Sequence, residues 1–349
     1  MYIFNNYWCY CMAKEKKKQH FIPQCYLENW QISNKHHIYM YDKTTKKISQ
    51  PDIKDVAQKR YFYDIAFSEM IKQNVLDSYG FSVDDVKKLE DKQLIENYFA
   101  NQIEGDYKQQ LNRIIQRANT MTPWEIKHCH FITDEEKMKF TFHLALQLVR
   151  VNSVRSSIQA TNDCMIQIFH DMGIPQHAID RHTLSKTQLS FIHGRIILDG
   201  DKINETAELL FSLKWLLWDL KTSQSIYTSD NPIGTEEHIH HPFLSMNGLN
   251  CRGVEVYFPI SPNLMLLMFD GDYHTFTQKH DCKIIQSNDE QDIINRMNIR
   301  TIINAERFVF SNTNDFRIIE DLLKKDPTIF SQPKTVVHWG GKTYTPNKT

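Results

Sequence analysis

The sequence predicts an α+β fold that is predominantly α-helical, with long amphipathic helices packed on a small sheet that is antiparallel or mixed. Three observations predict it. Apolar residues recur at helical steps across 83–117, a second helical pattern follows Thr133, and short apolar runs bounded by Pro and Ser occupy 225–270. With 349 residues, 41% hydrophobic and 24% charged, the chain can bury a core without disulfides or metal.

The first helix and the first strands are expected close to the N-terminus. In HFIPQCYLENW, Pro23 sets a helix start, and Tyr26, Leu27 and Trp30 then fall on one helical face. Farther along, IYMYD and YFYD are strand-like, and the turn-like DKTTKK lies between them. The segment 38–63 is therefore predicted to form a short hairpin or two extended pieces.

Two long helices are predicted next. The first, over 83–117, has one apolar stripe, which is formed by Leu94, Tyr98, Ile103, Tyr107, Leu111 and Ile114. The second begins at the cap Thr133 with the acidic turn DEE and ends at Gly173 and Pro175. A break is expected near Thr161, because an uninterrupted pattern of this length would be long for a globular helix.

The second half of the chain is predicted to add the sheet. The segment 176–204 is mixed in pattern and is the expected place for a boundary or a mobile connection. AELLFSLKWLLWDL is either a buried helix or a strand, whereas SIYTSDNPI and VEVYFPISPNLMLLMF indicate strands. A helix over 289–304 and a strand RFVFS follow. We expect one globular domain over 18–330, an N-terminal extension at 1–17 and a polar tail at 331–349.

Composition bounds the cellular setting and the partners. The 41 basic residues nearly balance the 42 acidic ones, so any contact with nucleic acid must be local. Seven cysteines without C-x-x-C spacing suit reduced thiols. No run approaches the roughly 18 apolar residues that span a bilayer, and the start of the chain, Met1 or Met12, is not followed by a signal peptide. A soluble, cytoplasmic protein without a membrane partner is expected, and its oligomeric state stays open.

Several common catalytic motifs do not occur in the sequence. There is no G-x-x-x-x-G-K-[ST], no G-x-G-x-x-G, no G-x-S-x-G and no H-E-x-x-H, and the chain has only eleven glycines. These observations argue against nucleoside triphosphatases, Rossmann dehydrogenases and the common hydrolases.

One candidate site lies on the second long helix. Gln147 and Arg150 are three residues apart, on one face of an otherwise apolar stretch. A buried guanidinium needs an anionic partner, and Glu104 on the other long helix is the proposed one. Two interpretations remain open here, a structural pair between the helices and a side chain that faces a substrate.

Two further polar sets have both structural and functional interpretations. Asp230 lies in TSDNP at a predicted strand end, where it is either an active-site carboxylate or a turn former that caps backbone amides. His20 is a general base, a metal ligand or a core histidine. The other histidine clusters lack the paired spacing of a zinc site and are interpreted as solvated loops; they are His36-His37, His128-Cys129-His130 and His238-Ile239-His240-His241.

The motifs together resemble a known family. HFIPQCYL, VAQKRYFYD, IENYFANQIEG, QLVRVNSVR, YTSDNPI and VYFPISPNLMLL occur in the order and approximate spacing of the bacterial "domain of unknown function 4238" family, over residues 18–312. Gln24 departs from the Arg that this family usually has after the opening proline. The resemblance implies that ten residues match marked family positions: His20, Tyr26, Glu104, Gln147, Arg150, Ser229, Asp230, Asn231, Pro232 and Pro262.

A shared polar site is the simplest explanation of such marked positions, although the family supplies no reaction. We therefore expect a hydrolase of phosphodiester or nucleotide substrates, a nuclease-like effector of bacterial defence or toxin systems. Glu104 and Asp230 would hold a divalent cation, Mg²⁺ or Mn²⁺, and His20 would move a proton. Arg150 would stabilise phosphate charge, and the other substrate-binding residues would be Gln147, Ser229, Asn231 and Tyr26.

Two alternatives use the same residues differently. In the first, the protein is a non-catalytic binding or sensor module, in which the polar cluster is structural and an aromatic surface recognises the ligand. That surface would consist of Tyr61, Tyr63, Trp215 and Trp218. In the second, the protein is a transferase or hydrolase that consumes NAD, with Arg150 at the pyrophosphate and Glu104 at the ribose.

Overall fold

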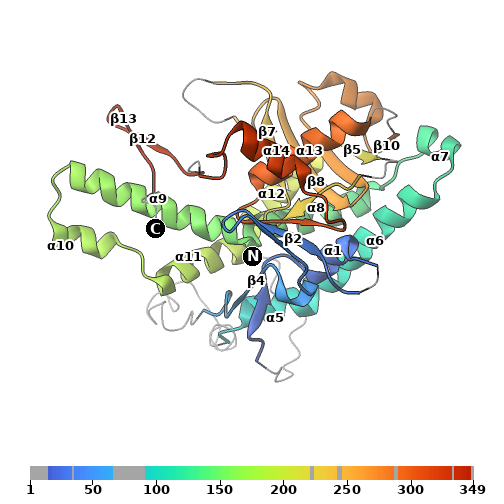
Figure 1. The fold of residues 1–349 in the computed structure, drawn as a ribbon. Helices are drawn as coiled ribbons and strands as arrows, with labels where there is room; N and C mark the ends of the chain where they lie inside the picture. Colours follow the sequence, from blue (N-terminus) through green and yellow to red (C-terminus); the bar gives the residue numbers. More distant parts are fainter. Residues whose placement is uncertain are drawn as a thin grey trace.

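The fold of the chain is shown by a computed structural model, which describes residues 15–33, 35–65, 91–220, 224–241, 246–286, 290–331 and 334–346. It confirms the predicted α+β class with predominant helix (Figure 1). None of the described helices is long and apolar enough to cross a membrane.

The N-terminal part forms a two-stranded ribbon and a hairpin. β1 (Lys18–His20) pairs antiparallel with β4 (Gln58–Arg60). Between them, β2 (Tyr39–Asp42) and β3 (Lys47–Ser49) form a hairpin around the turn in DKTTKK. A hairpin was one of the two expected forms of this segment, but its second strand is Lys47–Ser49 and not YFYD. The predicted strand YFYD is wrong, because the backbone of Tyr61 has a φ of 52° and leaves the extended region directly after β4.

The first helix is short and anchors the ribbon in the core. α1 (Gln24–Leu27) starts after Pro23, as predicted, and continues into a 3₁₀ turn (Glu28–Trp30). The rings of Tyr26 and Trp30 are in contact, and Tyr26 stacks on Phe258 of the main sheet. This apolar face fixes the N-terminal segment against the sheet.

The first long helix contains a π-helical segment in its middle, which the sequence pattern does not indicate. Its described part runs through α5 (Leu94–Tyr98), a π-helical segment (Phe99–Ile103) and α6 (Glu104–Thr120). Most of the predicted stripe is buried, from Leu94 to Ile114. The start of the predicted helix, 83–90, lies outside the described residues.

The second long helix is two helices. α8 (Asp134–Arg150) begins with the predicted cap, a capping box between Thr133 and Glu136. It ends at Val151, whose extended backbone starts α9 (Asn152–Asp171). The break was expected near Thr161, so its position was predicted wrongly. Val151 is buried, and the turn at this point anchors the side chain of Asn152 to Glu306.

The segment of mixed pattern is helical in the structure. It contains α10 (Gln176–Ile179), α11 (Lys186–Leu198) and the start of α12 (Gly200–Ser212). The run AELLFSLKWLLWDL, for which the sequence allows a helix or a strand, contains both. Helix α12 ends at Ser212, and strand β5 (Lys214–Asp219) follows.

The main sheet has helices on both faces. Its five strands lie in the order β10 (Lys283–Gln286), β5, β9 (Leu264–Phe269), β8 (Val254–Ser261) and β7 (Gly234–Glu237). Only the β10–β5 pair is parallel. Every residue of β8 and β9 is buried. Alternate side chains pack into the large core with α1, α6, α8 and α12, and the others pack against α13 (Glu290–Asn304).

The smaller sheet joins distant parts of the chain. Its order is β3, β2, β11 (Phe308–Ser311) and β6 (Thr228–Ser229), with α14 (Arg317–Lys325) packed beside it. β6 begins the TSDNP motif, and β11 is the predicted strand RFVFS. The expected polar tail contains a hairpin of β12 (Val337–Trp339) and β13 (Lys342–Tyr344), which lies beside α9 (Figure 1). Short helix α7 (Pro123–His128) connects α6 to α8.

Candidate functional site

A polar pocket lies between the β1–β4 ribbon and the first long helix. Its volume is about 370 Å³. The pocket collects two carboxylates, one imidazole and three ammonium groups, and its lining residues are Lys16, Lys18, His20, Gln24, Lys54, Glu96, Ala100 and Glu104. Of the residues predicted from the sequence as catalytic, His20 and Glu104 therefore share one pocket.

The π-helical segment explains why both carboxylates reach this pocket. Glu96 lies on α5 and Glu104 begins α6, eight positions later. In a regular α-helix, eight residues overshoot two full turns by about 80°. A π turn accommodates an additional residue, so that this spacing returns to the same face. Such segments occur often at functional sites.

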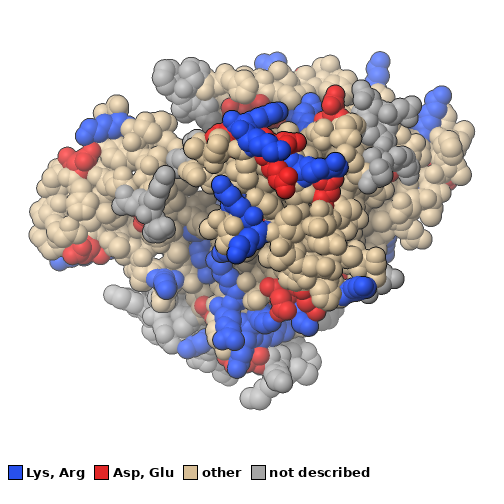
Figure 2. All heavy atoms as spheres, viewed as in Figure 1, with Lys and Arg blue, Asp and Glu red and all other residues tan. Residues whose placement is uncertain are grey.

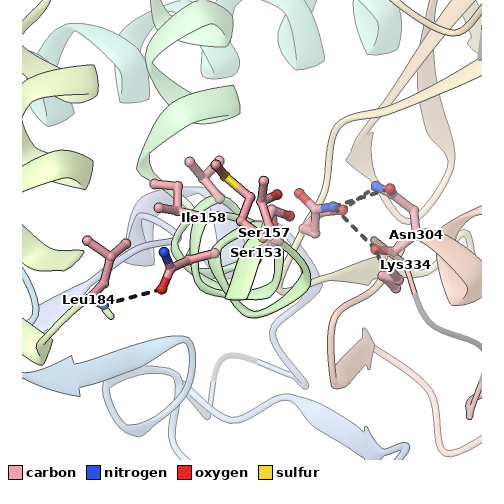
Figure 3. A pocket seen from close by; sticks show the side chains of 11 residues that line it. Ser153, Ser157, Ile158, Leu184, Asn304 and Lys334 are labelled. Carbon is pink, nitrogen blue, oxygen red and sulfur yellow. Dashed lines mark hydrogen bonds between the residues drawn. The ribbon is translucent and has the colours of Figure 1, made fainter. Parts of the chain in front are cut away.

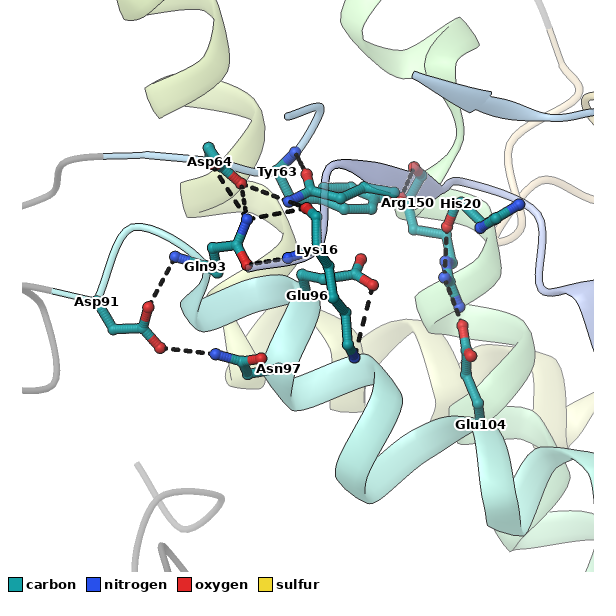
Figure 4. Close-up of polar contacts among 11 residues, drawn as sticks. Lys16, His20, Tyr63, Asp64, Asp91, Gln93, Glu96, Asn97, Glu104 and Arg150 are labelled. Carbon is teal, nitrogen blue, oxygen red and sulfur yellow. Dashed lines mark hydrogen bonds and ion pairs between the residues drawn. The ribbon is translucent and has the colours of Figure 1, made fainter. Parts of the chain in front are cut away.

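Arg150 joins Glu104 to the ribbon (Figure 4). One of its terminal nitrogens donates to Glu104 Oε1 at 3.0 Å and to the backbone oxygen of His20 at 2.7 Å. The guanidinium also lies over the ring of Phe99, 4.0 Å from its centroid. The predicted Arg150–Glu104 pair is confirmed. The Arg150 side chain is only 3% exposed, against 34% for Glu104. Arg150 therefore does not face the solvent in the pocket, and it holds His20 and Glu104 in position from the buried side.

The hydrogen bond of His20 fixes its tautomer. Nε2 lies 3.1 Å from the backbone oxygen of Lys54, and since this oxygen can only accept, Nε2 carries the proton. The lone pair of the neutral ring is then on Nδ1. Burial lowers the pKa of His20 below its ordinary value of 6.5, which keeps the ring neutral at neutral pH.

Glu96 titrates in the neutral range. Burial raises its pKa to about 7; the ammonium group of Lys16 opposes this shift and Glu104 adds to it. The Lys16 nitrogen is 3.8 Å from Glu96 Oε1. Sequence reasoning missed Glu96 and the three lysines. IENYFANQIEG does contain both glutamates, but their spacing indicates different faces unless the π segment is known.

Gln147 and Tyr26 support the pocket region from the core. Gln147 is buried and donates to the backbone oxygen of Phe21 at 3.3 Å. The hydroxyl of Tyr26 is 2.8 Å from the backbone oxygen of Pro259 and 2.6 Å from Thr228 Oγ1. Neither residue lines the pocket. The structure thus places these two expected substrate-binding residues behind the site.

Asp230 holds a turn at a different place. Its two carboxylate oxygens accept the backbone N–H groups of Glu306 at 2.8 Å, and of Arg307 and Phe308 at 2.9 Å each. Asp230 is buried, which raises its pKa to about 6. Asp230 does not line the pocket that contains Glu104. In the described part of the chain, no three His, Cys, Asp or Glu side chains are grouped so as to hold a metal.

The neighbours of Asp230 belong to the same turn. Ser229 Oγ accepts the backbone N–H of Asn231 at 3.1 Å. The side chain of Asn231 donates to Asn304, and both residues lie at the edge of a second pocket of about 600 Å³ along α9 (Figure 3). The TSDNP motif therefore connects β6 to α13 and β11. The local capping that the turn interpretation expects is made by Ser229, whereas Asp230 accepts backbone amides from a distant segment of the chain.

Two other expectations are corrected by burial and pairing. His238 is not simply solvated, because its Nε2 lies 2.8 Å from Oε2 of the buried Glu255. The aromatic recognition surface is not formed: Tyr63 and Trp215 are buried in the core, whereas Tyr61 is 40% exposed. Among the described residues, Tyr61 is therefore available to a ligand, whereas Tyr63 and Trp215 are not.

Comparison with known proteins places the chain in a family. No curated protein and no solved structure matches it. The family model described as "Protein of unknown function (DUF4238)" matches residues 18–315, which include every residue that lines the pocket except Lys16. This range covers most of the chain and agrees with the resemblance in the motifs. The chain therefore belongs to the family "Protein of unknown function (DUF4238)".

Proposed function

We propose that this protein is a hydrolase of phosphodiester or nucleotide substrates, and that the pocket between β1 and the α5–α6 helix is its active site. One observation carries the proposal. His20, Glu96 and Glu104 face the same pocket as three lysines, so that proton-transfer groups and anion-binding groups share one cavity.

The lysines would bind the substrate phosphate. Lys18 is already paired with Asp55, and the Lys54 nitrogen lies 2.9 Å from Asp52. Ion pairs that are open to water are weak, so a phosphate group can replace the carboxylates. Gln24 also lines the pocket, and its neutral amide can donate a hydrogen bond to a phosphate oxygen.

His20 and Glu96 would divide the proton transfers. Nδ1 of the neutral His20 accepts a proton from the attacking water, whose oxygen forms the new bond to phosphorus. Protonated Glu96 donates its proton to the leaving oxygen as the old P–O bond breaks. The lowered pKa of His20 and the raised pKa of Glu96 favour the protonation states that this division requires below about pH 7.

A divalent cation is part of the proposal, with Glu104 as its ligand. Glu104 Oε1 accepts from Arg150, and Oε2 has no recorded partner in the described chain. Mg²⁺ is commonly held by one or two carboxylates together with substrate phosphate and water. Asp230 is left out as a ligand because backbone amides occupy both of its oxygens. We expect EDTA to abolish hydrolysis and Mg²⁺ or Mn²⁺ to restore it. Full activity in EDTA would remove the cation from the proposal.

The proposal is tested by turnover of a substrate panel. Purified protein is incubated with bis(4-nitrophenyl) phosphate, nucleotides and oligonucleotides, with Mg²⁺ or Mn²⁺. We expect Glu104→Gln to lower kcat at least about a hundredfold, since a neutral amide would hold the divalent cation far more weakly than the carboxylate does. The amide oxygen can still accept from Arg150, and assays well below the unfolding midpoint keep the variant folded. Glu205→Gln is the matched control, because Glu205 is exposed on α12 and 61% accessible.

Two results would contradict the proposal. One is a wild-type protein that turns over none of these substrates with either cation. The other is a folded Glu104→Gln variant that is as active as Glu205→Gln. In its narrower form, the proposal is a nuclease-like effector of bacterial defence or toxin systems, which requires that the pocket accept a polymer.

A further inference from the structure

The β1–β4 ribbon extends the cationic wall of the pocket beyond its mouth. In the antiparallel register, Lys18 is opposite Arg60 and His20 is opposite Gln58. Directly opposite residues share a face of the ribbon, and so do residues two positions apart on one strand. Lys18, Arg60 and His20 therefore share one face. Because Lys18 and His20 line the pocket, Arg60 continues this face outward from it.

The cations of the ribbon are open to solvent. Lys17, Lys18 and Arg60 are all exposed. Figure 2 shows Lys and Arg side chains gathered in a band across the lower part of the face where β1 and β4 lie in Figure 1. Acidic side chains also lie near the ribbon: Asp55 pairs with Lys18, Glu96 lies 3.8 Å from Lys16, and Asp64 accepts from Gln19. No hydrogen bond or ion pair is recorded between the Arg60 side chain and any described residue.

An exposed aromatic residue lies at the end of the ribbon. Tyr61 directly follows Arg60 and is 40% exposed. Its backbone N–H donates to the backbone oxygen of Lys17 at 3.0 Å, which ties it to the start of the ribbon. Its φ of 52° is uncommon for a residue with a side chain, and such conformations are concentrated at functional sites. For its hydroxyl, too, no partner is recorded within the described ranges.

Cations along a backbone track, together with an exposed aromatic ring, form the arrangement that binds single-stranded nucleic acid. We propose that an extended single strand lies along the β1–β4 ribbon, with one phosphate held between Lys18 and Arg60 and an unpaired base stacked on Tyr61. Rows of side chains on this face repeat about every 6.6 Å along the strand, so the next phosphodiester of the polymer enters the pocket beside His20. The entry of this phosphodiester into the pocket rests on the proposed function. The binding of the single strand to the ribbon does not depend on that function.

The inference is tested by fluorescence anisotropy with a labelled oligothymidine and a labelled DNA duplex of equal length. We expect oligothymidine to bind more tightly than the duplex. Tyr61→Ala should weaken binding about five- to a hundredfold, whereas Tyr61→Phe should bind like the wild type, because stacking needs the ring. Arg60→Gln should weaken binding. It should also reduce the magnitude of the negative slope of log association constant against log salt concentration by about one, because one phosphate contact is lost. Lys139→Gln on α8, an exposed lysine outside the ribbon, is the control.

The two proposals fail in distinguishable ways. If no substrate is hydrolysed but Tyr61→Ala still loses oligothymidine binding, the ribbon is a nucleic-acid site and the hydrolase proposal is wrong. If bis(4-nitrophenyl) phosphate is hydrolysed while Tyr61→Ala and Arg60→Gln bind oligothymidine like the wild type, the ribbon inference is wrong. Equal affinity for duplex and single strand, unaffected by loss of the ring, would show a general polyanion surface and would also overturn it.

Discussion

Replacing Glu96 with Gln is expected to lower kcat/KM for phosphodiester hydrolysis about 10²- to 10⁴-fold, the range of a lost general acid. Gln has nearly the same shape, and it cannot release a proton to a leaving oxygen. The measurement is the initial rate of hydrolysis at a pH near 6.5, where Glu96, with its pKa of about 7, is largely protonated. Glu135→Gln, an exposed glutamate on α8, is the matched control.

The stability of this variant separates a chemical role from a structural one. The pKa of Glu96 is about 7 in the folded protein, above the 4.5 of an unfolded chain. The folded state therefore binds the extra proton between these values, and the ionised side chain opposes folding at higher pH. Glu96→Gln should consequently not lower the free energy of unfolding at pH 8. An active variant, or one that unfolds more easily at pH 8, would contradict the assigned role.

Replacing Asp230 with Ala is expected to have the largest effect on stability. Three backbone N–H groups at 306–308 would lose their acceptor in a buried environment. Each such group costs about 1 to 3 kcal/mol when left unsatisfied, so the free energy of unfolding should fall by about 3 kcal/mol or more. Asp230→Asn should cost less, since the amide oxygen still accepts. Denaturant unfolding measures both variants.

The control for this substitution is Asp321→Ala, because Asp321 is 63% exposed on α14. Its expected change lies within about 0.5 kcal/mol. An Asp230→Ala protein with wild-type stability and no hydrolytic activity would show instead that Asp230 acts in catalysis. That result would restore Asp230 to the set of catalytic residues that the motif resemblance implied.

Local signals predicted much of the fold. Pro23 and Thr133 start helices because each satisfies the geometry of a helix N-terminus without help from distant residues. The break at Val151 could not be predicted in this way. At the break Asn152 binds Glu306, a residue 154 positions away that the sequence pattern does not connect to it.

The candidate site was predictable only in part. The Glu104–Arg150 pair followed from the cost of a lone buried guanidinium, and the structure contains it. Glu96 was missed because a π segment changes which residues share a helix face. Asp230 was grouped with Glu104 because both belong to family motifs. A motif does not distinguish a residue that holds a turn from a residue that lines a pocket.

The dependence of kcat/KM on pH, for the wild type and for Glu96→Gln, tests the central claim most directly. For the wild type the account predicts a bell. Its acid limb lies below 6.5, where protonation of His20 removes the base, and its alkaline limb lies near 7, where Glu96 loses the proton it donates. In Glu96→Gln the alkaline limb should disappear from the residual activity. A wild-type rate that keeps rising to pH 9, or an alkaline limb that persists in the variant, would contradict the account.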